Sequence, residues 1–183
     1  MWLLLATLIA VALVIIVTRG SFAELGRSHA AAAWLLILGL GIQAALEYVD
    51  FPRAEIDTVG YGLLMLSYAF ILSFCFANIR ARGFGVIAIG IAMNALVIGL
   101  NQGMPTKPVG DNSQGNRIYK PVERTVKHRQ ESSHDLLAVL GDRILFPKPF
   151  DTLVSFGDLV IAVGICEFGY YATRSRTDSD QVT

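Results

Sequence analysis

The chain has 183 residues, of which 54% are hydrophobic and 16% are charged, and its formal net charge is zero. A soluble domain carries about 25% charged residues. The low charge and the mean hydropathy of +0.53 therefore favour an integral membrane protein over an ordinary soluble domain. Zero net charge provides no overall field that would attract nucleic acid, so no nucleic-acid partner is expected. The length predicts one domain, residues 1–183.

Five apolar runs follow one another along the chain, and each is expected to cross a membrane as a helix. No water reaches the backbone at membrane depth, so a spanning segment must satisfy its own hydrogen bonds. The first run has no Lys or Arg before it, which indicates an uncleaved first span. The predicted fold is an all-α bundle of five transmembrane helices, with spans at residues 2–17, 30–46, 59–78, 84–100 and 153–172.

The charges in the short connections predict how the spans are oriented. Basic residues favour the cytoplasmic side. They occur in the first connection, in the third connection and in the tail, whereas the second connection is acidic. We therefore expect the N-terminus outside and the C-terminus in the cytoplasm. The long loop at residues 101–152 is then also outside, although it holds more basic than acidic residues. The arginines used are Arg19, Arg27, Arg80, Arg82, Arg174 and Arg176.

The long loop divides into two parts of different character. Residues 106–133 are polar and rich in glycine and asparagine, which is typical of irregular structure. In residues 134–146, apolar side chains recur at helical spacing between charged ones. This pattern predicts a short amphipathic helix that lies on the membrane surface or caps the bundle. Its apolar positions are Leu136, Leu137, Leu140 and Ile144.

Two groups of polar residues lie in or beside the last two spans. Ser155 and Asp158 form an S-x-x-D capping box ahead of an apolar run, which predicts a structural cap. The alternative is that Asp158 faces a bound cation or His134. Asn94 and Asn101 are seven residues apart, so they share one helix face. They predict either a helix–helix contact or the lining of a cavity.

His134 is the histidine most suited to chemistry, because Asp135 follows it and Asp142 comes eight residues later. Such a group could bind a metal or move a proton. One histidine with scattered acids is a weak pattern, and no metal or other cofactor is assigned. His128 is expected on a solvated face. No catalytic motif occurs in the chain, so an enzyme is not the favoured class.

The second half of the chain carries a series of short motifs, at residues 94–98, 101–105, 140–144 and 154–159, together with Pro147 and Gly164. In order and spacing they resemble domain-of-unknown-function family 5317, a bacterial family of short multi-pass membrane proteins. The chain departs from the family pattern at Gln102 and Phe156. The resemblance implies an integral protein of a bacterial plasma membrane and supplies no activity.

The polar residues of the second half are expected to converge at the outer membrane surface. Two functions remain open for this cluster. The favoured one is an accessory or interaction protein, in which the cluster is a structural latch and the loop recruits a membrane protein or a second copy. The alternative is a small transporter or membrane enzyme that binds an ion, lipid headgroup or small solute there. The cluster comprises Asn94, Asn101, Met104, Pro105, His134, Asp142, Ser155 and Asp158.

Overall fold

A computed structural model describes residues 2–27, 30–48, 52, 55–107, 110–111, 117–118, 122, 124–146 and 152–174. The described chain is mostly helical, and each of the five apolar runs forms a helix. A π-helical turn, η1 (Ile56–Gly60), leads directly into the third of them. The helices are α1 (Trp2–Val17), α2 (Phe22–Arg27), α3 (Ala33–Tyr48), α5 (Tyr61–Ala77), α6 (Phe84–Asn101) and α7 (Phe156–Ala172).

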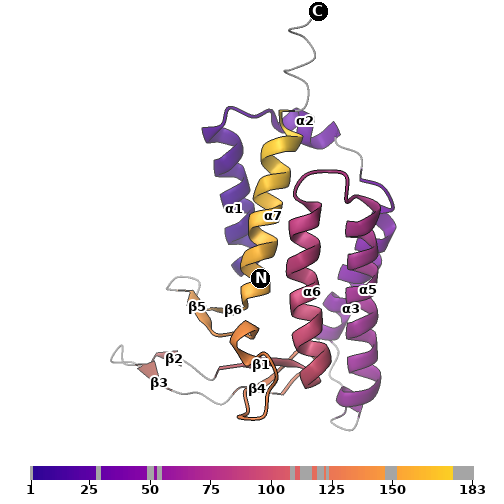
Figure 1. Ribbon diagram of the computed structural model, residues 1–183, viewed down its shortest axis with the longest axis vertical. Helices are drawn as coiled ribbons and strands as arrows, with labels where there is room; N and C mark the ends of the chain where they lie inside the picture. The colour runs from indigo at the N-terminus through magenta and orange to yellow at the C-terminus, as the bar shows by residue number, and fades with distance from the viewer. Residues whose placement is uncertain are drawn as a thin grey trace, which may run out of the picture.

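The long helices pack in an order that differs from their order in the chain. Contacts join α1 to α7, α7 to α6, α6 to α5 and α5 to α3 (Figure 1). The main hydrophobic core lies around α5 and α6, in the middle of this series. Helices α1 and α3 are therefore the outer members, and large parts of their apolar surfaces stay exposed.

Successive long helices run in alternating directions, so their connections collect at two ends. At one end the turn before α3 meets the end of α5, where Ala31 exchanges two 2.8 Å hydrogen bonds with the Asn78 side chain. Thr173, after α7, contacts Gly20, after α1. We call this the arginine end, because Arg19, Arg80, Arg82 and Arg174 lie there. The other end carries the described residues between Asn101 and Val154 and is called the loop end (Figure 1).

Short strand pairs shape the loop end. β1 (Met104–Thr106) pairs in parallel with β4 (His128–Gln130), with Met104 opposite His128. β2 (Gly110–Asp111) pairs antiparallel with β3 (Arg117–Ile118). β5 (Ile144–Phe146) pairs antiparallel with β6 (Thr152–Val154), which delays the start of α7 to Phe156 instead of residue 153.

The prediction of an amphipathic helix at residues 134–146 is wrong. The segment holds one 3-10 turn, η2 (Ala138–Leu140), and then enters β5. Leu137 has a left-handed backbone with φ 54°, a conformation that ends a right-handed helix. The backbone of Leu136 is bonded through both its N–H and its carbonyl to the Asn101 side chain. These groups are therefore not available for a helical ladder.

Two helical segments are long and apolar enough to cross a membrane, by length and composition alone. They are Ile56–Ala77, which combines η1 with α5, and Phe84–Asn101, which is α6. Helices α1 and α3 have 16 residues each and α7 has 17. The assignment of five spans therefore stays a prediction.

Candidate functional site

Helices α6 and α7 approach closely because glycines face each other across the contact. A Cβ atom added at Gly157 would lie 2.1 Å from Asn94 Oδ1 and 2.7 Å from the carbonyl oxygen of Gly90. One added at Gly90 would lie 2.6 Å from the Gly157 carbonyl oxygen. Small residues let two helix backbones come together in this way. The close approach brings the Asn94 amide to the beginning of α7.

Asn94, Ser155 and Asp158 form a closed hydrogen-bonded ring at this contact. Asn94 Nδ2 donates to Asp158 Oδ1 at 2.9 Å, and Ser155 Oγ donates to Asn94 Oδ1 at 2.9 Å. The Asp158 N–H donates to Ser155 Oγ, and the Ser155 N–H donates to Asp158 Oδ2, both at 3.1 Å. The last two bonds are the capping box, as predicted. Asn94 is an interhelical contact, the first of its two predicted roles.

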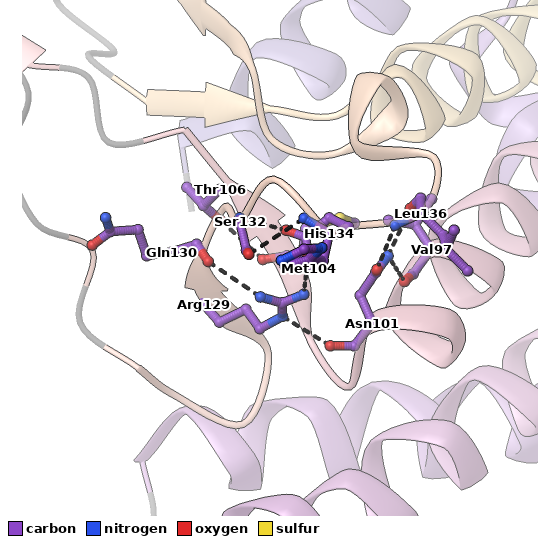
Figure 2. Close-up of polar contacts among 10 residues, drawn as sticks. Val97, Asn101, Met104, Thr106, Arg129, Gln130, Ser132, His134 and Leu136 are labelled. Carbon is purple, nitrogen blue, oxygen red and sulfur yellow. Dashed lines mark hydrogen bonds and ion pairs between the residues drawn. The ribbon is translucent and has the colours of Figure 1, made fainter.

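Asn101 fastens the loop to the end of α6. Its Nδ2 donates to the carbonyl oxygens of Val97 and Leu136, both at 2.8 Å, and its Oδ1 accepts from the Leu136 N–H at 2.9 Å. One side chain therefore serves a helix carbonyl and both backbone groups of a loop residue (Figure 2). The loop segment at Leu136 is positioned by this clasp.

Arg129 links the same helix end to the loop from the other side. Its Nε donates to the Asn101 carbonyl oxygen at 2.8 Å, and its Nη2 pairs with Asp135 (Figure 2). Asp135 Oδ2 accepts from the Ser132 N–H at 2.7 Å, and the Asp135 side chain is 4% exposed. A nearly buried carboxylate is thus fully engaged within the loop.

Asp142 is a buried residue of the loop that contacts both strands of the β1–β4 pair. Its Oδ2 contacts His128 Nδ1 at 3.0 Å and accepts from Thr106 Oγ1 at 3.4 Å. Its N–H donates to the Pro105 carbonyl oxygen at 3.0 Å. Met104 and Pro105 are among the fully buried side chains. The side chains of these two residues therefore pack in the interior and are not accessible to a ligand.

Seven of the eight predicted cluster residues fall into two groups, and His134 belongs to neither. Three of the seven form the ring between α6 and α7, and four form the Asn101 clasp and the Asp142 layer. The His134 side chain is exposed, and the backbone N–H of His134 donates to Ser132 Oγ at 3.4 Å. The histidine that contacts Asp142 is His128, which had been expected on a solvated face.

An open groove of about 450 Å³ lies beside the clasp. His134 and Gln102 reach its surface, and Tyr61 closes one side with a 3.1 Å hydrogen bond from its hydroxyl to the Gly99 carbonyl oxygen. Asp135 and Arg129 also line it, but each already has a protein partner. Among the residues that line the groove, His134 and Gln102 are exposed and make no side-chain hydrogen bond within the described part of the chain.

The sequence reasoning missed His128, Arg129 and Thr106. Each depends on the parallel pairing of β1 with β4, which brings residues 104–106 beside residues 128–130. Both strands have three residues, too few to produce an alternating hydrophobic pattern. The signal available was Pro105, shortly after the end of α6, because proline cannot continue a helix.

Three loop arginines each face a carboxylate. Arg129 pairs with Asp135, Arg124 pairs with Asp57 just before α5, and Arg143 pairs with Glu131 through two hydrogen bonds. The hydrogen bond to Glu131 raises the pKa of Arg143. Asp135 and Glu131 belong to the loop itself, whereas Asp57 lies outside it and compensates one unit of the loop's basic excess. Among the described residues, no group of three or more His, Cys, Asp or Glu side chains could hold a metal ion.

The fold and this end of the molecule define a mostly helical protein whose polar loop is fastened across the ends of two closely packed helices. The chain belongs to a family of unknown function (DUF5317), which matches residues 27–170. The match includes the ring, the clasp and the Asp142 layer. No curated protein and no solved structure matches the chain.

Proposed function

We propose that the protein is a five-span protein of a bacterial plasma membrane that acts as an accessory protein, binding a membrane protein partner through its loop end. The observation that supports membrane embedding is the large exposed apolar surface on every long helix. In water such surface favours association or aggregation, whereas lipid tails solvate it. Examples are Leu13 and Ile16 on α1, Trp34 and Ile37 on α3, Phe76 on α5, Ile89 on α6 and Val163 on α7.

The shorter helices fit this proposal if the bilayer adapts around them. A helix of 16 residues spans about 24 Å, a few ångströms less than a typical hydrocarbon core. Short spans are accommodated by local thinning and by flanking residues that reach the interface. The alternating directions of the five long helices also suit five crossings.

The charges support an orientation with the loop end outside. At the arginine end, the arginines lack carboxylate partners among the described residues, so the positive-inside rule applies to them directly. At the loop end, Arg124, Arg129 and Arg143 are each paired with an acid. Asp57 lies outside the loop, so its pair with Arg124 offsets one unit of the loop's basic excess and lessens the conflict with an outer location. The N-terminus is then outside and the C-terminus is cytoplasmic.

The polar cluster supports an interaction role over a ligand site, because its groups are already used. No buried side-chain nitrogen or oxygen in the described part of the chain lacks a hydrogen-bond partner. What the loop presents instead is an apolar tip, formed by Leu136, Leu137 and Val139, which are 57%, 44% and 56% exposed. An exposed apolar patch rimmed by polar residues is typical of protein contacts.

The alternative function, binding a small solute, ion or lipid headgroup, is favoured by the groove beside Asn101. Its volume of about 450 Å³ falls within the range of small-molecule sites, and His134 is exposed there. Its open, polar walls provide little of the apolar enclosure that such sites use. We therefore place it second.

The test compares two loop positions by site-specific photo-crosslinking in native membranes. A photoreactive residue replaces Leu137 at the apolar tip, and the control replaces Arg124, which is also exposed. We expect one reproducible crosslinked protein from position 137 only. A product with twice the monomer mass would identify a second copy as the partner. Equal labelling from both positions, or labelling of lipid alone, would contradict partner binding by the tip. Mass spectrometry of the uncrosslinked protein for a retained small molecule tests the alternative.

A further inference from the structure

Four exposed arginines gather at the arginine end. None of them makes an ion pair with a carboxylate anywhere in the described ranges. Glu167 lies one turn before Tyr171 on α7 and is also outside every described ion pair. The four are Arg19, Arg80, Arg82 and Arg174, and all are exposed.

Two of these arginines belong to one continuous stack with two tyrosines. The Arg82 guanidinium lies over the Tyr171 ring, 4.2 Å from its centroid, and Arg174 lies over the Tyr170 ring at 4.4 Å. The two rings meet edge to face, with centroids 5.0 Å apart. Attraction of a cation by a ring face holds each guanidinium in place. Two like charges are thus fixed on a joined aromatic pair.

The stack is anchored to its neighbours, but many of its donors stay free. Arg174 Nη2 donates to the Thr18 carbonyl oxygen at 2.9 Å, which ties the end of α7 to the end of α1. Arg174 Nη1 donates to the Tyr170 hydroxyl at 2.5 Å. Arg82 makes no hydrogen bond to any residue in the described part of the chain. Its N–H groups, and the remaining ones of Arg174, are free for an external acceptor.

The position of the stack indicates what that acceptor is. Phe76 and Ile79 precede Arg82 closely in the sequence, and they are 63% and 47% exposed. Apolar side chains of this kind suit acyl chains, while tyrosines and arginines suit the headgroup level. Guanidinium groups bind phosphate through paired N–H donors. Phosphate beside an apolar surface is the chemistry of an anionic phospholipid.

We propose that the Arg82–Tyr171–Tyr170–Arg174 stack is a binding site for the phosphate of an anionic phospholipid in the cytoplasmic leaflet. The bound phosphate offsets the repulsion between two guanidiniums and accepts their free donors. The site rests on the proposed membrane embedding and is independent of partner binding by the loop. Its role would be to fix the arginine end at the membrane surface.

The experiment uses the full-length protein in detergent, with native mass spectrometry of added phosphatidylglycerol and phosphatidylcholine. The test variant is R82Q together with R174Q. The matched control is R124Q together with R143Q, which removes the same charge from the loop end. Each basic residue near an anionic lipid contributes about a fivefold preference. We expect the wild type and the control to prefer phosphatidylglycerol, and the test variant to lose roughly 25-fold in that preference.

Several results would overturn the site. These are an unchanged preference in the R82Q/R174Q variant, an equal loss in the control, or binding of inorganic phosphate without binding of phosphatidylglycerol. If the double variant misfolds, R82Q alone, which removes no described hydrogen bond, must still lower the preference several-fold. Retention in membranes after an alkaline carbonate wash is measured separately. That measurement tests membrane embedding, so its failure is distinguishable from failure of the lipid site.

Discussion

The two ends of this molecule use the same kind of charge in opposite ways. At the loop end, Arg124, Arg129 and Arg143 each meet a carboxylate, and Asp142 meets His128. At the arginine end, Arg82 and Arg174 lie over tyrosine rings, and no ion pair with a carboxylate is found for Arg19, Arg80, Arg82 or Arg174 among the described residues. An arginine that is paired with a carboxylate holds two segments of the chain together, whereas an arginine without such a partner can bind an external anion. A count of basic residues treats the two ends alike, because it does not distinguish paired arginines from unpaired ones.

The largest expected effect is at the glycine contact that holds the loop end to the helices. Gly157→Ala should destabilise the protein by about 3 kcal/mol, because overpacking here forces Asn94 away and separates the helices. The matched control is Gly62→Ala on α5, where an added Cβ meets no atom within 4 Å. That change should be neutral or stabilising by about 0.5–1 kcal/mol. Thermal unfolding in detergent measures both, and equal unfolding midpoints would contradict a tight α6–α7 contact.

Removal of the buried carboxylate should open the layer under the loop. Asp142→Ala leaves the side chains of His128 and Thr106 without this partner, which costs about 1–3 kcal/mol. We expect faster proteolysis within residues 107–141 and little change at the arginine end. Hydrogen exchange followed by mass spectrometry distinguishes the two regions. Uniform loosening of both ends would argue against a separate latch at the loop end.

The capping box provides a smaller and more specific test. Asp158→Ser keeps a short polar side chain and should cost about 1 kcal/mol or less, since Asn94 keeps its bond from Ser155. Crosslinking from position 137 should persist if Asp158 is structural. Loss of that crosslink in a variant that folds and expresses normally would give Asp158 a functional role.

The smallest expected effects come from exposed arginines at either end. Arg143→Gln removes a pair whose arginine side chain is 36% exposed, and such pairs contribute about 0–1 kcal/mol. Arg82→Gln, which removes no described hydrogen bond, should alter stability by a similarly small amount. The two variants should differ instead in lipid preference, which only Arg82→Gln should lower. A large stability loss in either would mean that its charge has a partner beyond those described.

The helices could be predicted from hydropathy because apolar runs of this length leave few alternatives. The capping box was also readable, since Ser155 and Asp158 are local in sequence. Asn94 was identified by its spacing on α6, but its partners were not, because they lie more than 60 residues away. The facing glycines, Gly90 and Gly157, were the available signal for that contact.

The loop could not be predicted by periodicity. Leu136 and Leu137 follow a helical spacing, yet the Asn101 side chain takes the backbone groups that a helix needs. His134 was favoured over His128 because it stands near Asp135 in sequence. Which histidine contacts Asp142 depends instead on the pairing of β1 with β4, which brings His128 to Asp142. Contacts of this kind depend on tertiary structure, which local patterns do not encode.

The most direct test of the account asks whether the two ends lie on opposite sides of a membrane. Ser133→Cys at the loop end and Ala81→Cys at the arginine end are both at exposed positions. Each is introduced after replacement of Cys75 and Cys166, and intact cells are treated with a membrane-impermeant maleimide. The account predicts labelling at position 133 in intact cells and at position 81 only after permeabilisation. Labelling of both positions under the same condition, or the reverse order, would contradict it.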